Sequence, residues 1–370
     1  MDSANTAIAL DGEYQEEVLP LLIRRIGMAE FGGDHVRVLD RRLLPHEEKH
    51  VICSSVEEVA NAIEDMVIQG AFTTAIAAGY GLALALSGRS LSGHQDTAAA
   101  LGAAAERLSR TRPTGLAVRR VVSTALASAI DAANVSGDVV AAIVSVVDAY
   151  SSEIARQALA TGRWANSLIP DGAGLLTHCF ADRAFLYTLL EARRSGKELH
   201  IYCSETRPYL QGARLTAPSI LQIGYTPTLV TDGMGGLLMY ERRVDMLLTA
   251  ADRVCMDGTI CNKVGTFQFA ASAAATGIPY YVLRQSGPDR ESLSAADIDV
   301  EYRSPKSVVE CCGKSTTVDG VEALYPAFDV TPANLVTSII CDRGIYNPTA
   351  IATYFDSRGP AALSASDVAK

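Results

Sequence analysis

Residues 174–203, GLLTHCFADRAFLYTLLEARRSGKELHIYC, decide the fold of this chain. The stretch begins with a short apolar strand at 174–177, continues with a helical segment at 183–195 and ends in a second strand at 199–203. The same alternation continues downstream, with strands at 227–231, 245–249 and 279–283 and helical segments at 219–223, 237–242 and 266–276. Strands that alternate with helices are typical of a parallel, doubly wound sheet. We therefore predict an α/β domain with such a sheet over residues 161–370.

The residues before this domain follow a different pattern. Two short apolar runs at 36–40 and 50–53 flank a proline-containing turn, and we expect them to pair as antiparallel strands. Ser54 or Ser55 then caps a helix start, with a glutamate three positions further on. Longer helical patterns follow at 78–86, 97–108, 116–133 and 139–160. Residues 1–160 are therefore predicted to form a mostly helical domain with a small antiparallel sheet.

The composition is that of a packed globular protein, with 48% hydrophobic and 20% charged residues in a chain of 370. A net charge of −10 argues against nucleic-acid binding, which needs a basic surface. The longest apolar run, at 71–86, contains threonine and glycine, and we expect a buried helix there and no membrane span. The eight cysteines contain no CxxC pair and residues 1–15 do not form a signal peptide, so we expect a cytoplasmic protein.

Polar clusters follow most of the predicted strands. They include a thiol, two carboxylates, a lysine and three arginines, and they comprise Thr177-His178-Cys179, Glu205-Thr206-Arg207-Pro208 with residues 210–216, Ala251-Asp252-Arg253-Val254 and Asn262-Lys263-Val264-Gly265-Thr266. In an open α/β sheet, ligands bind beyond the carboxyl ends of the strands. The clusters therefore predict a small-molecule site that transfers protons on an anionic, phosphorylated substrate.

Two residues in these clusters have both a structural and a chemical interpretation. Cys179 is either a buried structural cysteine or a reactive thiol whose pKa is lowered by a helix N-terminus and a nearby arginine. His178 is expected to face the other side of the strand, because successive side chains alternate. Asp252 is either a turn cap paired with Arg253 or a partly desolvated carboxyl with a raised pKa that acts as a general acid.

Anion binding is predicted from cations and amides around the same strand ends, namely Arg112, Arg207, Gln211, Arg214, Asn262 and Lys263. Asn262 and Lys263 precede a helix start, where backbone N–H groups favour an anion. Arg112 lies in a loop of the helical domain and can close over the same cleft. A solvated surface position is the alternative for each cation. The glycines after the strand at 227–231 lack the GxGxxG spacing of a dinucleotide-binding loop.

Together these motifs resemble the methylthioribose-1-phosphate isomerase family. The motifs that carry the resemblance are Thr177-His178-Cys179, Glu205-Thr206-Arg207-Pro208 with Gln211-Gly212-Ala213-Arg214-Leu215-Thr216, Ala251-Asp252-Arg253, Asn262-Lys263-Val264-Gly265-Thr266 and Pro326-Ala327-Phe328-Asp329-Val330-Thr331-Pro332. The family is related to ribose-1,5-bisphosphate isomerase and to the regulatory subunits of translation initiation factor 2B. The resemblance runs in order from about residue 36 to residue 348.

This resemblance implies a fold, an activity and a set of site residues. The fold would be a small N-terminal domain on a Rossmann-like C-terminal domain, in a homodimer. The activity would be aldose–ketose isomerisation of a sugar 1-phosphate, without a metal or a nucleotide cofactor. Cys179 and Asp252 would be the catalytic pair. The residues implied to bind the substrate are Gly70, Ala71, Arg112, Gln211, Asn262 and Lys263.

A mechanism follows from these implied roles. An anomeric phosphate blocks ordinary opening of the sugar ring, so an acid has to protonate the ring oxygen, and Asp252 would do so. Hydrogen then moves from C2 to C1. Cys179 would either act as a base through an enediol or assist a direct hydride shift.

The chain departs from the family pattern in three of its motifs. Gln69 stands where the Arg-Gly-Ala-Pro motif has its phosphate-binding arginine, Phe180-Ala181-Asp182-Arg183 replaces the usual Asn-Thr-Gly, and Cys261 replaces an alanine. One interpretation is a divergent paralogue with another substrate, in which Arg183 or Arg112 supplies the missing charge. The other is a non-catalytic regulatory or metabolite-sensing protein, like the initiation factor 2B regulatory subunits. A ribose-1,5-bisphosphate isomerase would need a second phosphate site, which the sequence does not reveal.

Overall fold

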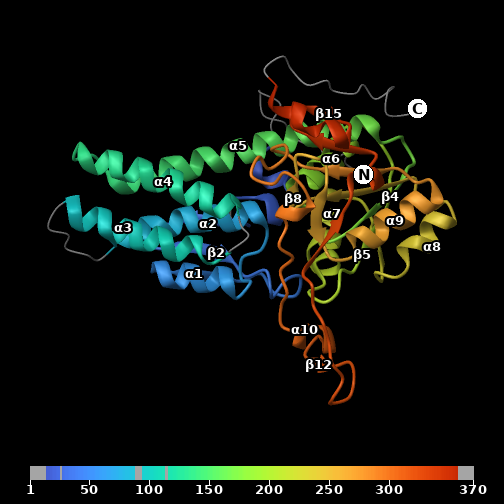
Figure 1. Ribbon diagram of the computed structural model, residues 1–370, viewed down its shortest axis with the longest axis horizontal. Helices are drawn as coiled ribbons and strands as arrows, with labels where there is room; N and C mark the ends of the chain where they lie inside the picture. Colours follow the sequence, from blue (N-terminus) through green and yellow to red (C-terminus); the bar gives the residue numbers. More distant parts are fainter. Residues whose placement is uncertain (1–13, 26, 88–93, 113–115, 357–370) are drawn as a thin grey trace. The chain divides into compact units, whose positions relative to one another are not determined.

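The computed structural model describes residues 14–25, 27–87, 94–112 and 116–356 of the chain (Figure 1). These residues form two compact units, an N-terminal unit that ends at residue 155 and a C-terminal unit that begins at residue 156. The domain boundary predicted between residues 160 and 161 falls inside helix α5 (Val139–Leu168), whose last turns belong to the C-terminal unit.

The N-terminal unit combines a small antiparallel sheet with helices. The sheet has the order β1-β2-β3, formed by Ala29–Phe31, Val36–Leu39 and His50–Cys53. The helices are α1 (Val56–Glu64), α2 (Ala71–Ala83), α3 (His94–Ser109), α4 (Leu116–Asn134) and the first part of α5. Ser55 caps α1, because its Oγ accepts a hydrogen bond from the Glu58 N–H at 3.2 Å. The predicted strand pair is confirmed, and β1 adds a strand that the sequence did not indicate.

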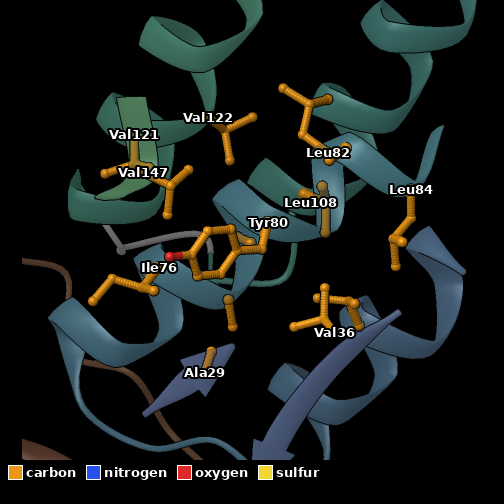
Figure 2. Packing of buried hydrophobic residues seen from close by; sticks show 14 of the residues in the cluster. Ala29, Val36, Ile76, Tyr80, Leu82, Leu84, Leu108, Val121, Val122 and Val147 are labelled. Carbon is orange, nitrogen blue, oxygen red and sulfur yellow. The ribbon is translucent and has the colours of Figure 1, made fainter. Parts of the chain in front are cut away.

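Helix α2 is the centre of the N-terminal core. All of its residues from 72 to 83 are buried, and Tyr80 packs inside this cluster (Figure 2). A Cβ atom at Gly79 would lie 2.6 Å from a methyl group of Val147, so the close approach of α5 requires glycine there. Burial against neighbouring helices therefore accounts for the apolar run at 71–86. Among the described helices, none has the length and apolar character needed to cross a bilayer.

A seven-stranded sheet forms the C-terminal unit. Its strands are β4 (Gly174–Thr177), β5 (His200–Ser204), β6 (Thr228–Val230), β7 (Met246–Ala250), β10 (Tyr280–Leu283), β14 (Ser338–Cys341) and β15 (Gly344–Tyr346). Their spatial order is β15-β14-β10-β7-β4-β5-β6, and every neighbouring pair is parallel except β14 and β15. Without the antiparallel edge strand β15, this is the strand order of the Rossmann fold. The predicted α/β fold class is therefore confirmed.

Helices connect the parallel strands of this sheet. They are α6 (Asp182–Arg194), α7 (Ala217–Ile223), α8 (Gly235–Tyr240) and α9 (Thr266–Thr276). Helices α7 and α9 each end at a glycine in the left-handed conformation, Gly224 with φ 99° and Gly277 with φ 71°. A left-handed glycine stops a helix and turns the chain, here toward β6 and β10. Most of the predicted helices and strands of this unit thus lie within a few residues of their expected bounds.

Two smaller sheets were not predicted. One is antiparallel, has the order β13-β9-β8 and contains Phe328–Thr331, Ile260–Lys263 and Arg253–Val254. The other is the hairpin of β11 (Glu310–Cys311) and β12 (Lys314–Ser315), which follows helix α10 (Lys306–Val309). Asn262 and Lys263 therefore lie in a strand, whereas the sequence indicated only that they precede a helix start. The partner strand β13 is far away in sequence, so no local pattern identifies this pairing.

Short helical turns complete the described chain. One is a π-helical turn, η4 (Gly212–Thr216), which leads directly into α7. The others are 3₁₀ segments, η1 (Glu16–Val18), η2 (Leu21–Ile23), η3 (Leu84–Leu86), η5 (Ala295–Asp297), η6 (Ala333–Leu335) and η7 (Pro348–Phe355).

Candidate active site

Strands β4 and β7 define the position of the candidate site. They are neighbours in the sheet, with Leu175 opposite Met246, although β5 and β6 lie between them in sequence. This is the point at which the strand order reverses, and open α/β sheets bind ligands beyond the carboxyl ends of the strands at such a point. Cys179 lies two residues after the end of β4, and Asp252 lies two residues after the end of β7. The predicted catalytic pair therefore flanks the topological switch point.

Two threonines from the segment after β5 hold the backbone of Cys179. The Cys179 N–H donates to Thr206 Oγ1 at 2.9 Å, and Thr216 Oγ1 donates to the Cys179 carbonyl oxygen at 2.6 Å. These bonds fix Cys179 in a left-handed conformation with φ 63°, which is uncommon for a residue other than glycine. The backbone N–H groups of Thr206 and Arg207 in turn donate to the carboxylate of Asp232, at 2.8 and 2.7 Å. Three successive strand ends are thus connected by hydrogen bonds.

The thiol of Cys179 is a weak acid in this setting. Burial raises its pKa to about 11, the positive charge of Lys263 opposes this shift, and the negative charge of Asp252 adds to it. The expectation that a helix N-terminus would lower this pKa is therefore wrong. The backbone N–H of Phe180 does lower it, but desolvation is the larger effect. At neutral pH the Cys179 side chain is a thiol.

Asp252 lies on the bend between β7 and β8, and its side chain is exposed. The expectation of a partly desolvated carboxyl is therefore wrong for the described structure, because the bend projects beyond the end of the sheet. Its charge nevertheless reaches its neighbours, since it raises the pKa of Cys179 and also acts on Lys263. Asp252, Cys179 and Lys263 are thus electrostatically coupled.

Strand β9 positions Asn262 and Lys263 differently. Both are buried, and successive side chains of a strand point to opposite faces. Lys263 Nζ donates to the Ala327 carbonyl oxygen at 2.9 Å and lies 4.5 Å from the centre of the Phe328 ring. Asn262 Nδ2 instead donates to Thr266 Oγ1 at 3.0 Å, at the start of α9. Burial lowers the pKa of Lys263, while the nearby Cys179 acts in the opposite direction.

Several buried polar atoms have no hydrogen-bond partner in the part of the chain that the structure describes, and two of them bear on the candidate site. They are the side-chain amide oxygen of Gln211 and the hydroxyl group of Tyr325. An unsatisfied buried polar atom is costly, and such atoms often mark places where water or a ligand binds. Gln211 belongs to the predicted site, and Tyr325 lies near enough to Cys179 for their charges to interact. Both groups are available to a polar ligand.

Sequence reasoning missed an aromatic and cationic cluster beside Lys263. The rings of Tyr209 and Tyr325 meet edge to face with their centres 5.6 Å apart. The Arg303 guanidinium lies 5.6 Å from the Tyr209 ring centre and also donates to Glu301 Oε1 at 2.6 Å. Arg303 lowers the pKa of Lys263, so two positive charges lie near each other, as an anion site requires. The one available signal was that Tyr325 directly precedes the Pro326-Ala327-Phe328-Asp329 motif.

His178 has a structural role next to this site. Its side chain is 1% exposed, its Nε2 donates to the Val264 carbonyl oxygen at 2.9 Å, and its Nδ1 accepts from Ser204 Oγ at 2.6 Å. Burial lowers the pKa of His178 to about 4, so the ring is neutral at physiological pH. A Cβ at Gly265, where φ is 104°, would lie 3.0 Å from this ring, so only glycine fits there. His178 therefore fixes the turn between β9 and α9.

The remaining predicted site residues, Gly70, Ala71 and Arg112, belong to the N-terminal unit. Gly70 precedes helix α2 with φ 92°, and Ala71 is the first residue of that helix. Arg112 Nη2 contacts Met66 Sδ at 2.9 Å, and Gln69 Nε2 donates to the Met66 carbonyl oxygen at 3.1 Å. The structure thus gathers these three residues around the turn at 66–71. Arg41, which the sequence analysis did not identify, is buried beside the same turn and donates to the Gln69 carbonyl oxygen at 2.8 Å.

The fold and the site together define a class of protein. The doubly wound sheet makes this an α/β protein, and the thiol and the carboxylate that flank its switch point, with a buried lysine nearby, make this end of the sheet its candidate ligand site. Across the described residues we find no group of three or more histidine, cysteine or acidic side chains arranged to hold a metal ion. The chain belongs to the initiation factor 2 subunit family, whose model matches residues 67–348.

Individual relatives make the resemblance more specific. The methylthioribose-1-phosphate isomerase of Roseiflexus castenholzii is 39% identical over 329 residues, which are 85% of this chain and 92% of the relative. The crystal structure of 5-methylthioribose 1-phosphate isomerase from Pyrococcus horikoshii superposes with a TM-score of 0.77 at 31% identity, covering 91% of this chain and 97% of the other. The delta subunit of translation initiation factor eIF-2B from A. fulgidus superposes with a TM-score of 0.72 at 29% identity, covering 87% and 96%. The resemblance seen in the sequence motifs is therefore confirmed.

Proposed function

We propose that this protein is an aldose–ketose isomerase that converts a sugar 1-phosphate into the ketose 1-phosphate. The substrate is methylthioribose 1-phosphate or another ribose 1-phosphate modified at C5. The observation that carries this proposal is the position of Cys179 and Asp252 on either side of the switch point, with the buried Lys263 coupled to both. The names of the relatives support the same activity.

Asp252 is the acid in this proposal. The anomeric phosphate prevents the sugar from opening by loss of its C1 hydroxyl proton, so the ring oxygen has to be protonated. A substrate that covers Asp252 and displaces its water favours the protonated form, because desolvation disfavours the charge. Substrate binding therefore prepares the acid.

Cys179 assists the movement of hydrogen from C2 to C1. In the enediol route Cys179 acts as a thiolate that takes the C2 proton and returns it to C1, and the C2 hydroxyl proton passes to the Asp252 carboxylate and restores the acid. In the hydride route the hydrogen moves directly from C2 to C1, and the side chain shapes and desolvates the site. The positive charge of Lys263 favours the thiolate, whereas burial favours the thiol. Both routes remain compatible with this arrangement.

Lys263, Arg303 and the Gln211 amide form the binding part of the proposed site. Lys263 supplies positive charge beside Cys179, Arg303 lies near Lys263, and a phosphate favours the charged form of a buried lysine. The unsatisfied Gln211 amide oxygen accepts a hydrogen bond from a sugar hydroxyl group. In the N-terminal unit, Gly70, Ala71 and Arg112 remain substrate-binding residues that only the family resemblance implies.

The test is the turnover of methylthioribose 1-phosphate by the wild type and by Asp252→Asn. Loss of general acid catalysis costs about 10²–10⁴-fold in rate, so kcat of Asp252→Asn should fall by at least about 100-fold. Asp319→Asn is the matched control, because this exposed aspartate lies in another loop, and it should keep the wild-type rate. An Asp252→Asn variant with wild-type kcat would remove the acid role from this residue.

A regulatory or metabolite-sensing protein is the second candidate. The observation that favours it is Gln69, which stands where the family pattern has a phosphate-binding arginine. The likeness to the A. fulgidus delta subunit agrees with it. In that case the wild type would be stabilised against heat by a sugar phosphate and would leave the same sugar phosphate chemically unchanged.

A further inference from the structure

A pair of adjacent cysteines lies in a hairpin of the C-terminal unit. Strand β11 ends at Cys311, which is opposite Lys314 of β12, and Cys312 and Gly313 form the connecting turn. Both turn residues have positive φ angles, 51° at Cys312 and 76° at Gly313. Figure 1 shows that α10 and this hairpin extend away from the large sheet of the C-terminal unit.

The turn geometry does not explain why a cysteine occupies position 312. Two residues with positive φ form a type I′ turn, and asparagine, aspartate or glycine is preferred at the first of them. A cysteine in the left-handed region costs free energy that asparagine would not cost to the same extent. The hairpin would therefore form more readily with Asn-Gly than with Cys312-Gly313. A chemical role of the thiol accounts for a residue that the backbone does not favour.

The two thiol groups of this pair are close together and open to solvent. Their Sγ atoms are 3.9 Å apart, and Cys311 donates a weak hydrogen bond to Cys312. Cys312 is exposed and Cys311 is half-buried, whereas five of the other six cysteines are buried, namely Cys53, Cys203, Cys255, Cys261 and Cys341. The sixth, Cys179, is partly buried. Reagents in solution therefore reach the Cys311–Cys312 pair first.

One positive charge is fixed beside the pair. Arg207 Nη2 donates to the carbonyl oxygens of Val308 and Glu310, at 2.9 and 3.1 Å, so its guanidinium group is fixed beside the hairpin. Burial and the hydrogen bond to Cys312 raise the pKa of the Cys311 thiol, the charge of Glu205 adds to this increase, and the charge of Arg207 opposes it. Exposure and a nearby cation are conditions under which a thiol reacts, and Cys312 is the exposed member of this pair.

We propose that Cys311 and Cys312 are a reversible dithiol–disulfide site that reacts with low-molecular-weight disulfides. The exposed Cys312 thiol loses its proton, and its sulfur attacks one sulfur of the small disulfide. This breaks the small S–S bond, forms a mixed disulfide and releases one thiolate. The Cys311 sulfur then loses its proton and attacks Cys312 Sγ, which displaces the second thiolate. The protein loses two hydrogen atoms, and the small disulfide is reduced to two thiols.

The resulting bond is easily reversed. Neighbouring Cα atoms are about 3.8 Å apart across a trans peptide, whereas disulfides usually join Cα atoms about 4.4–6.8 Å apart. A bond between adjacent cysteines is therefore strained, and strained, exposed disulfides are the labile ones. The pair is consequently suited to cycling between two states and not to stabilising the fold. This inference is independent of the proposed isomerase activity.

The test uses the aromatic disulfide 4,4′-dithiodipyridine on the reduced, folded full-length protein, with release of pyridinethione followed by absorbance. Reaction at Cys311 and Cys312 should release two equivalents of pyridinethione. In the mass spectrum, the peptide that contains both cysteines should be two hydrogen atoms lighter and should carry no pyridyl adduct. Cys311→Ser should release one equivalent there and retain a stable adduct on Cys312. Dithiothreitol should restore both thiols in the wild type.

Two further variants serve as controls. Cys312→Asn suits the turn, so it keeps the hairpin and should carry one adduct on Cys311. Cys179→Ser removes the partly buried thiol elsewhere and should behave like the wild type at this peptide. The proposal is wrong if the wild-type peptide retains pyridyl adducts on both cysteines. A disulfide between two copies of the chain, seen as a dimer under denaturing, non-reducing conditions, would also overturn it.

Discussion

At the scale of single residues, the state of the Cys179 thiol results from two opposing effects. Burial raises its pKa to about 11, and the charge of Lys263 limits the increase. Each pKa unit corresponds to about 1.4 kcal/mol of differential interaction between the thiol and the thiolate. The side chain is thus kept protonated until an anionic substrate or a change of solvation alters this balance.

This balance predicts how Cys179 reacts with iodoacetamide, since only the thiolate is alkylated. The labelling rate of the Cys179 peptide should rise about tenfold per pH unit from pH 7 to pH 10 without a plateau, because the pKa is about 11. In Lys263→Met, Cys179 should be labelled more slowly than in the wild type at every pH, because the charge that favours the thiolate is gone. In the exposed control Lys306→Met, Cys179 should be labelled at the wild-type rate. Peptide mass spectrometry gives the rates. A plateau near pH 8 would contradict the raised pKa.

At the scale of elements, Asp329 of β13 connects the second sheet to helix α9. Its Oδ2 accepts the N–H groups of Gly265 and Phe267, at 2.7 and 3.1 Å, at the start of that helix. The carboxylate thus caps α9 from another strand and stabilises the positive end of the helix dipole. The same helix start lies next to Asn262, so this cap supports the candidate site. Burial nevertheless raises the pKa of Asp329 to about 6.

A pH dependence of stability follows from this shift. The pKa of Asp329 in the folded protein, about 6, lies above the reference value of 3.8 that applies to the unfolded chain. The folded state therefore binds this proton more tightly than the unfolded state. The stabilisation that comes from proton binding by Asp329 is therefore complete below about pH 4 and is lost as the pH rises through about 6. The free energy of unfolding of the wild type, relative to that of Asp329→Asn, should therefore decrease between these pH values and then level off. Urea unfolding at a series of pH values measures these free energies. Wild-type and Asp329→Asn stabilities that change in parallel with pH would contradict the raised pKa of Asp329.

At the scale of the whole molecule, the sequence predicted five strands of the large sheet but missed β14 and β15, and it predicted the second sheet not at all. The strands that end before Cys179 and Asp252 are buried apolar runs flanked by helices, which a local pattern identifies. Strand β9 is short, contains Asn262 and Lys263, and pairs with a strand 60 or more residues away, which local periodicity does not register. The charges of the site could be predicted, but their burial could not. The lowered pKa expected for Cys179 and the desolvation expected for Asp252 were wrong for this reason.

A homodimer is proposed from the family resemblance. The expected result is twice the chain mass in size-exclusion chromatography with light scattering at micromolar concentration. The measurement requires fully reduced protein, so that the exposed Cys312 cannot link two chains covalently. A single-chain mass under these conditions would contradict the homodimer and would leave the fold and the candidate site unchanged.

The measurement that tests the central claim most directly is proton NMR of methylthioribose 1-phosphate incubated with the wild type and with Cys179→Ser. The account predicts that the wild type replaces the anomeric C1 proton signal with the C1 methylene signals of the ketose 1-phosphate. Cys179→Ser should show no conversion and a melting temperature close to that of the wild type, because the hydrogen bonds that hold position 179 use its backbone. Full conversion by Cys179→Ser, or an unchanged substrate with the wild type, would contradict the account.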